Sequence, residues 1–179
     1  PPPPPPPLFF YTHTPAHEML RSLVGSEMCI RDRIGGAVKN IMAIAAGISD
    51  GLGFGSNARS AIITRGLSEI IRLGMTMGAK KETFKGLSGL GDLVLTCTDD
   101  QSRNRRLGIL FSKGYTSEQA CNEIGQEVEG LNTAREVNIL AKKNNIEMPI
   151  TEQVASVLDS RCTPKEAVEN LLNREQRKE

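Results

Sequence analysis

The first group of residues that could carry chemistry is one lysine inside an apolar run. In GGAVKNIMAIAAG, from Gly35 to Gly47, Lys39 and Asn40 alone have polar side chains. A helix that is apolar all round is normally buried, and a buried lysine is costly unless it is paired or neutral. Lys39 is therefore either a lysine whose long side chain reaches the surface, or an amine held in a pocket because a reaction needs it.

The second candidate is an acidic residue that follows a glycine-rich segment. Asp92 ends GLSGLGD and precedes LVLTC. An aspartate in this position is commonly the N-cap of a short helix. The alternative is that its carboxylate faces the same cavity as Lys39.

The third candidate is the polar segment QSRNRR, from Gln101 to Arg106. Its hydroxyl, guanidinium and amide groups, on Ser102, Arg103 and Asn104, suit phosphate oxygens. If the segment opens a helix, free backbone N–H groups add to an anion site. The alternative is a solvated basic face, which is the usual meaning of a charge run.

The elements that must position these groups are predicted to be helices. Capping boxes are expected at Thr116 with Gln119, at Thr133 with Glu136, and at Thr163 with Glu166, the last with Pro164 at the first helical position. The segment Asn57–Met77 has helical apolar spacing, and Gly78 and Gly114 stand where helix-ending glycines belong. No run alternates as a strand would. We expect an all-α fold of about seven helices, interrupted by glycine-rich loops at Ser49–Asn57 and Gly86–Asp92.

Composition excludes several classes of function. The net charge is +1 and only 4% of residues are aromatic, so nucleic acid is not an expected partner. The longest apolar run is shorter than the ~20 residues of a membrane span. The cysteines are scattered, at Cys29, Cys97, Cys121 and Cys162. They predict no metal site and no disulfide framework, and they favour a reducing, cytoplasmic compartment.

The first 33 residues do not resemble the rest of the chain. They start with a proline run and end in SEMCIRDR, which resembles a translated sequencing-adaptor fragment. We expect residues 1–33 to be a disordered, non-native leader and residues 34–179 to be one helical domain; the alternative is a natural proline-rich leader. Both histidines, His13 and His17, lie in the leader, so acid–base work in the domain must use Lys, Asp, Glu, Tyr or Cys.

Three long stretches give the chain a family resemblance. They are GGAVKNIMAIAAGISDGLGFGSNARSAIITRGL, GLSGLGDLVLTCTDDQSRNRRLG and EVEGLNTAREV. Together they closely resemble the C-terminal domain of bacterial NAD(P)-dependent glycerol-3-phosphate dehydrogenase, from Ile34 to about Glu169. The resemblance implies an all-helical domain of the 6-phosphogluconate dehydrogenase-like type. The family's N-terminal Rossmann domain has no counterpart here, and we expect a truncated gene model.

The resemblance also implies roles for individual residues. Lys39 matches the proton acceptor, and the substrate site comprises Lys39, Asn40, Asp92, Ser102, Arg103 and Asn104. Cofactor contacts fall on Arg103, Glu127 and Glu129, although Glu127 stands where the family has an aliphatic residue. No metal is implied. In a domain without histidine, a lysine can take a hydroxyl proton if burial among small apolar residues favours its neutral form.

The implied activity interconverts sn-glycerol 3-phosphate and dihydroxyacetone phosphate, which supplies the backbone of phospholipids. NAD or NADP would be held mainly by the N-terminal domain, so we expect this chain alone to be inactive. Two alternatives stay open: a non-catalytic helical module for anion binding or dimerisation, and a related dehydrogenase of another phosphorylated or hydroxy-acid substrate. The expected partners are the small-molecule substrate and, in a homodimer, a second copy of the chain.

Overall fold

The computed structural model describes residues 27–126 and 128–173, and this part of the chain contains helices and no strand, as expected for the all-α class. In chain order the elements are α2 (Glu27–Gly51), α3 (Gly55–Thr76), a 3-10 turn η1 (Lys81–Phe84), a π-helical turn η2 (Leu87–Gly91), α4 (Asp92–Thr98), α5 (Arg103–Ser112), α6 (Ser117–Ile124), α7 (Gly130–Lys143), α8 (Pro149–Leu158) and α9 (Pro164–Leu172). No described helix is long and apolar enough to cross a membrane.

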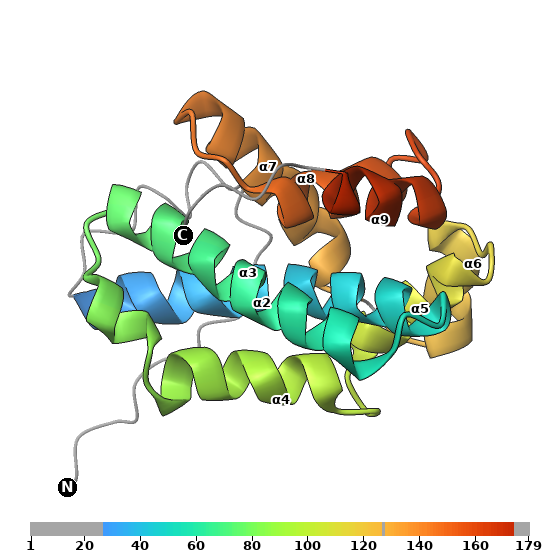
Figure 1. Ribbon diagram of the computed structural model, residues 1–179, viewed down its shortest axis with the longest axis horizontal. Coiled ribbons are helices and arrows are strands. Elements are labelled where there is room, and N and C mark those ends of the chain that lie inside the picture. The colour runs from blue at the N-terminus through green and yellow to red at the C-terminus, as the bar shows by residue number, and fades with distance from the viewer. Residues whose placement is uncertain (1–26, 127, 174–179) are drawn as a thin grey trace, which may run out of the picture.

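The centre of the fold is α2, the helix that contains the apolar run. It crosses the middle of the molecule, with α4 along one side and α7, α8 and α9 on the other (Figure 1). Every residue from Ile41 to Ser49 is buried. Five of the described helices pack against it: α3, α4, α5, α7 and α8. These neighbours explain why the buried stretch of α2 has apolar side chains on all sides.

Glycines let α2 and α5 approach until their backbones touch. A Cβ atom on Gly47 would lie 2.0 Å from the carbonyl oxygen of Arg105, and one on Gly108 would lie 2.1 Å from that of Ile44. Any side chain at either position would push the helices apart. The start of α5 is therefore held directly against the helix that carries Lys39.

Two of the three predicted capping boxes are confirmed. Thr116 and Thr163 cap α6 and α9, each in a reciprocal pair with the residue three positions later. The third prediction was wrong: Thr133 lies inside α7, where its hydroxyl donates to the carbonyl of Glu129. Helix α7 begins earlier, at Gly130, so the hydroxyl bonds back to the preceding turn instead of capping. Gly78 and Gly114 have φ of 92° and 87° after α3 and α5, as expected of helix-ending glycines.

The two glycine-rich segments are more ordered than the expected loops. Helix α2 continues through Ser49 to Gly51 and α3 begins at Gly55, which leaves a connection of residues 52–54. The second segment forms η2 and runs straight into α4. A Cβ on Gly89 would lie 2.1 Å from the carbonyl oxygen of Phe84, so this glycine permits tight packing. In the first segment Gly53 and Gly55 have φ of 82° and 75° and no atom within 4 Å of an added Cβ, so the turn of the chain requires glycine there. In the second segment close backbone packing requires Gly89.

The expected boundary between leader and domain falls inside a helix. Helix α2 begins at Glu27, so residues 27–33 form its first turns and differ from the expected disorder. Residues 1–26 lie outside the described residues. The non-native origin of the leader stays a prediction.

Candidate active site

Lys39 and Asp92 meet, as the sequence predicted. The Lys39 amine lies 2.6 Å from Oδ2 of Asp92, although the two residues are 53 positions apart. Their side chains are 26% and 40% exposed. Lys39 is thus not the isolated, fully buried amine that its apolar helix suggested, because it leaves α2 just before the buried stretch and has a carboxylate partner. An amine and a carboxylate that are paired and open to solvent can exchange protons with a bound molecule.

The turn before α4 explains why Asp92 faces Lys39. Asp92 is the first residue of α4 and not its N-cap; Gly91 occupies that position and makes no side-chain cap. The π-helical turn η2 leads into α4, which packs against α2. A carboxylate in the first turn of a helix is favoured by the helix dipole. The alternative interpretation, in which Asp92 was an N-cap, is therefore wrong.

Asn104 of α5 and Gly130 of α7 both lie beside α2. Asn40 is half-buried, and Ile44 follows it by one helical turn. A Cβ built on Gly130 would lie 2.4 Å from Oδ1 of Asn104 and 2.7 Å from Cδ1 of Ile44, so these groups meet. The backbone N–H of Gly130 donates to Oδ1 of Asn104 at 3.2 Å. This contact ties the start of α7 to the start of α5, next to α2.

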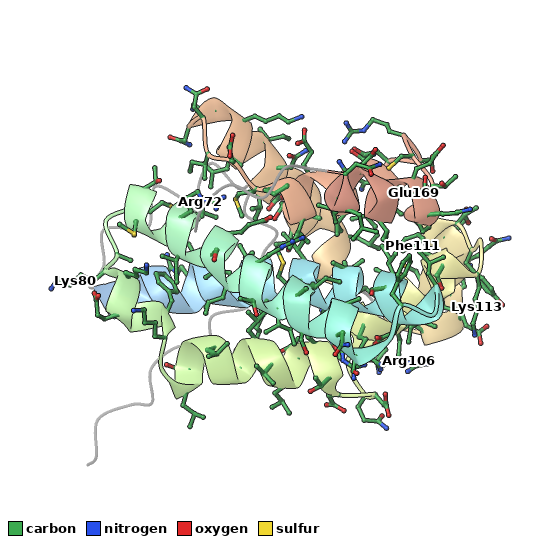
Figure 2. All side chains as sticks on the ribbon, in the orientation of Figure 1. Arg72, Lys80, Arg106, Phe111, Lys113 and Glu169 are labelled. Atoms are coloured by element: carbon green, nitrogen blue, oxygen red, sulfur yellow. The ribbon has the colours of Figure 1, made fainter. Side chains whose placement is uncertain are left out.

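The SRN segment opens a helix, as the anion-site interpretation required. Ser102 is the N-cap of α5, and its hydroxyl accepts from the N–H of Arg105 at 3.4 Å. Arg103 is exposed, and its Nη1 donates to Oε1 of Gln126 at 3.2 Å. Arg106 is also exposed (Figure 2). A hydroxyl, a guanidinium and free N–H groups thus share the start of one helix.

Of the residues expected to touch the cofactor, Glu129 lies between Gln126 and Gly130, which are hydrogen-bonded to Arg103 and Asn104. Glu129 is exposed at the start of α7 and does not cap that helix. Glu127 lies outside the described residues. The Arg103–Gln126 and Asn104–Gly130 hydrogen bonds hold this segment against α5. The exposed guanidinium of Arg103 suits a phosphate group, and the exposed carboxylate of Glu129 suits hydroxyl groups, of a ligand that has both.

Sequence reasoning missed Arg105, which it placed in a solvated basic run. Arg105 is buried, and its guanidinium donates to Asp50 and Asp100, with the shortest contact to each at 2.8 and 2.6 Å. Both carboxylates hold the pKa of the Arg105 guanidinium above its ordinary value against the opposing effect of desolvation. The available signal was helical spacing, since Arg105 stands three residues before Gly108 on the face that meets α2.

Glu69, in the middle of α3, was also missed. It is 1% exposed and accepts from the N–H of Ile150 at 2.6 Å and from the N–H and hydroxyl of Thr151 at 3.2 and 2.8 Å. It therefore caps the start of α8 from another helix. Burial raises the pKa of Glu69 to about 7, although these hydrogen bonds and Arg72 oppose the rise. Its place four residues before buried Leu73 was the available signal.

The other candidate acid–base groups are less suited to catalysis. Burial raises the pKa of the Cys97 thiol to about 12, which leaves it protonated at neutral pH. Cys97, Cys121 and Cys162 are free thiols. Among the described residues no three His, Cys, Asp or Glu side chains gather as they would around a metal ion.

Comparisons with known proteins agree with the all-helical fold. The sequence profile of the family described as "NAD-dependent glycerol-3-phosphate dehydrogenase C-terminus" matches residues 30–169. The chain belongs to this family. It is 59% identical over 147 residues to a glycerol-3-phosphate dehydrogenase [NAD(P)+] of Pseudoalteromonas translucida, and likewise 59% identical over 147 residues to one of Shewanella halifaxensis. These matches cover 82% of this chain but only 44% and 43% of the relatives, so the chain spans less than half their length.

Two solved structures of glycerol-3-phosphate dehydrogenases have this fold. Glycerol-3-phosphate dehydrogenase from Coxiella burnetii superposes with a TM-score of 0.80 at 49% identity, over 89% of this chain and 51% of that one. The Saccharomyces cerevisiae enzyme gives a TM-score of 0.71 at 30% identity, over 78% of this chain and 41% of that one. The all-helical domain thus corresponds to about half, or less, of the length of these two chains.

Proposed function

We propose that this domain carries the catalytic lysine and the substrate site of an NAD(P)-dependent glycerol-3-phosphate dehydrogenase, which interconverts sn-glycerol 3-phosphate and dihydroxyacetone phosphate. The observation that carries the proposal is the accessible Lys39–Asp92 pair, at 2.6 Å. Membership of the family and the printed names of its relatives support the choice of substrate.

Lys39 moves the proton of the reaction. Oxidation of a secondary alcohol to a ketone removes a hydride from carbon and a proton from the hydroxyl oxygen. The bound nicotinamide accepts the hydride, and the neutral amine of Lys39 accepts the proton. In the reverse direction the ammonium group donates the proton to the ketone oxygen. A positioned acid–base group of this kind typically contributes about 10²- to 10⁴-fold to the rate.

Asp92 orients the amine and contacts the substrate. The carboxylate accepts a hydrogen bond from Lys39 at 2.6 Å and remains 40% exposed. Its two oxygens have room for more than one donor, so it can hold Lys39 and accept from a substrate hydroxyl. Asn40, next to Lys39 on α2, supplies an amide that can form hydrogen bonds with the hydroxyl groups of the substrate.

The phosphate is held at the start of α5. Arg103 supplies the charge and a planar pair of donors, and the helix N-terminus adds backbone N–H groups. Ser102 and Asn104 flank it; since Oδ1 of Asn104 accepts from Gly130, the amide nitrogen is the group that would donate to an oxygen of the substrate. Binding through the phosphate fixes the reacting carbon relative to Lys39.

The cofactor is NAD or NADP, bound mainly by the part of the relatives that precedes this domain. Arg103, Glu127 and Glu129 are the residues of this chain that would contact it. Arg103 and Glu129 are both exposed, on segments that the Arg103–Gln126 and Asn104–Gly130 hydrogen bonds join, and this supports the assignment. We further infer a cytoplasmic location, because Cys97, Cys121 and Cys162 form no disulfide in the described part of the chain.

A chimaera tests the proposed function. Residues 30–179 of this chain replace the matching part of the Pseudoalteromonas translucida relative, and oxidation of NADH and NADPH is followed with dihydroxyacetone phosphate. We expect turnover by the chimaera and none by the 179-residue chain alone, because these residues match only 44% of that relative's length and the cofactor is expected to be held mainly by the remainder. A folded chimaera that is inactive with both cofactors would contradict the proposal and favour a non-catalytic module. Preference for another phosphorylated or hydroxy-acid substrate would support a related dehydrogenase.

A further inference from the structure

The middle arginine of the basic run points inward. Nε and Nη2 of Arg105 donate to Oδ2 of Asp50 at 3.0 and 2.8 Å, and Nη1 donates to Oδ1 of Asp100 at 2.6 Å. The side chains of Arg105 and Asp50 are 11% and 12% exposed. A guanidinium that already binds two carboxylates is poorly placed to bind a substrate phosphate.

Asp50 joins three segments of the chain at one atom. Its Oδ2 accepts from Arg105 of α5 and also from Nη1 of Arg59, in the second turn of α3, at 2.9 Å. Asp50 itself stands at the end of α2. Buried ion pairs are weak evidence for stability, because desolvation offsets their attraction. The three hydrogen bonds from the planar guanidinium of Arg105, two to Oδ2 of Asp50 and one to Oδ1 of Asp100, do fix its orientation.

Arg105 transmits this orientation to the proposed phosphate site. Its N–H donates to the hydroxyl of Ser102, and its carbonyl oxygen lies where a Cβ of Gly47 would be. Both its backbone and its side chain are thus fixed to α2. Arg103 and Asn104 lie between the two anchored residues, so their position relative to Lys39 depends on Arg105.

We propose that Arg105, held by Asp50, is a positioning residue for the substrate: it fixes the first turn of α5, with Ser102, Arg103 and Asn104, against α2. This inference rests on the proposed function, in which that turn binds the phosphate. Arg105 touches neither substrate nor cofactor. A loosened turn weakens the hold on the phosphate and leaves proton transfer at Lys39 unchanged.

The test is the division of the effect between KM and kcat in the chimaera. Arg105→Lys keeps the charge but cannot bind two carboxylates through a planar group. We expect KM for dihydroxyacetone phosphate to rise about 10- to 100-fold, as for a small misplacement of a binding group. The inhibition constant of inorganic phosphate should rise in parallel, whereas kcat and its pH profile should stay within about threefold of wild type, since Lys39 is untouched. Arg106→Lys, at the exposed neighbour, should change none of these.

A merely structural role would lower the active fraction, which reduces kcat and leaves KM unchanged; that result would overturn the inference. Asp50→Asn keeps the shape of the acceptor and provides the same test if Arg105→Lys does not fold. Arg103→Ala separates the two proposals. If Arg103→Ala raises KM and neither Arg105→Lys nor Asp50→Asn does so, the positioning role fails and the proposed phosphate site stands. If Arg103→Ala leaves KM unchanged, the proposed phosphate site itself fails.

Discussion

Helix α2 carries two charged pairs with opposite surroundings. Lys39 makes a single contact of 2.6 Å to Asp92, and both side chains are substantially exposed, at 26% and 40%. Eleven residues later, Oδ2 of Asp50 accepts from Arg105 twice and from Arg59 once, and its side chain is only 12% exposed. The first pair can be separated by a ligand. The second cannot be separated without moving three helices.

This difference suits a division of labour between chemistry and support. A group that gains and loses a proton must reach its substrate and must not be held in one charge state by several partners. A group that positions a binding turn works best when it is over-determined. The comparison predicts large effects on turnover at Lys39, in the middle of α2, and large effects on stability and binding at Asp50, at its end.

The largest expected effect is on turnover, at Lys39. In the chimaera, Lys39→Ala should lower kcat by about two to four orders of magnitude, the usual contribution of a general acid–base group. Arginine should not rescue, because it keeps its proton at neutral pH. Lys142→Ala, which removes a lysine from an exposed pair with Glu152 at 3.2 Å, is the matched control and should leave kcat unchanged. Near-normal kcat in Lys39→Ala would contradict the assignment of Lys39 as the group that transfers the proton.

The next largest effect separates the two aspartates by stability. Asp50→Ala leaves two arginines without their shared carboxylate, and loss of one partner from a buried pair costs about 3–5 kcal/mol. Asp92→Ala breaks a partly exposed pair, which is worth at most about 1 kcal/mol. Urea unfolding of the 179-residue chain measures both. Equal losses from the two substitutions would show that the pairs do not differ in kind.

The buried carboxyl group of Glu69 should make the free energy of unfolding depend on pH. Because its pKa is raised to about 7 from 4.5, the folded chain binds more protons than the unfolded chain between these values. The free energy of unfolding should therefore fall as pH rises through this range, by about 3 kcal/mol at most. Glu69→Gln should remove this dependence, whereas Glu118→Gln, at an exposed site, should not. Parallel pH curves for Glu69→Gln and wild type would contradict the assignment.

The smallest effect concerns the exposed arginines. Arg103→Ala should weaken binding of glycerol 3-phosphate to the chimaera by about 2 kcal/mol, the usual value of a hydrogen bond to a charged group. Arg106→Ala should change it by less than about 0.5 kcal/mol, as for an isolated surface charge. Calorimetric titration measures both. Equal weakening by the two substitutions would indicate a diffuse basic face in place of a specific site.

Local patterns in the sequence predicted much of the fold. The capping boxes at Thr116 and Thr163 depend on residues three positions apart, and Thr133 failed because the same spacing also occurs inside helices. The extent of α2 was not predictable in this way. Glycines such as Gly47 favour turns locally, and only the approach of α5 shows why one is needed in a helix.

The site was predictable where one residue type stood out from its surroundings. Lys39 was conspicuous in an apolar run, and its partner Asp92 followed from the resemblance together with the glycine-rich turn. Arg105 was not conspicuous because its neighbours in sequence are polar, and Glu69 was not because it is one of several polar residues spread along α3. The partners of both are distant: Asp50 lies 55 positions from Arg105, and Ile150 lies 81 positions from Glu69. Burial of a charge depends on such tertiary contacts, which short spacing does not contain.

The most direct test of the role of Lys39 is the pH dependence of the chemical step in both directions. In the chimaera, single-turnover oxidation of glycerol 3-phosphate needs a base and should rise with pH, whereas reduction of dihydroxyacetone phosphate needs an acid and should fall with pH. In Lys39→Ala both profiles should be flat. If the mutant keeps the wild-type profiles, another group moves the proton and Lys39 is not the catalytic base.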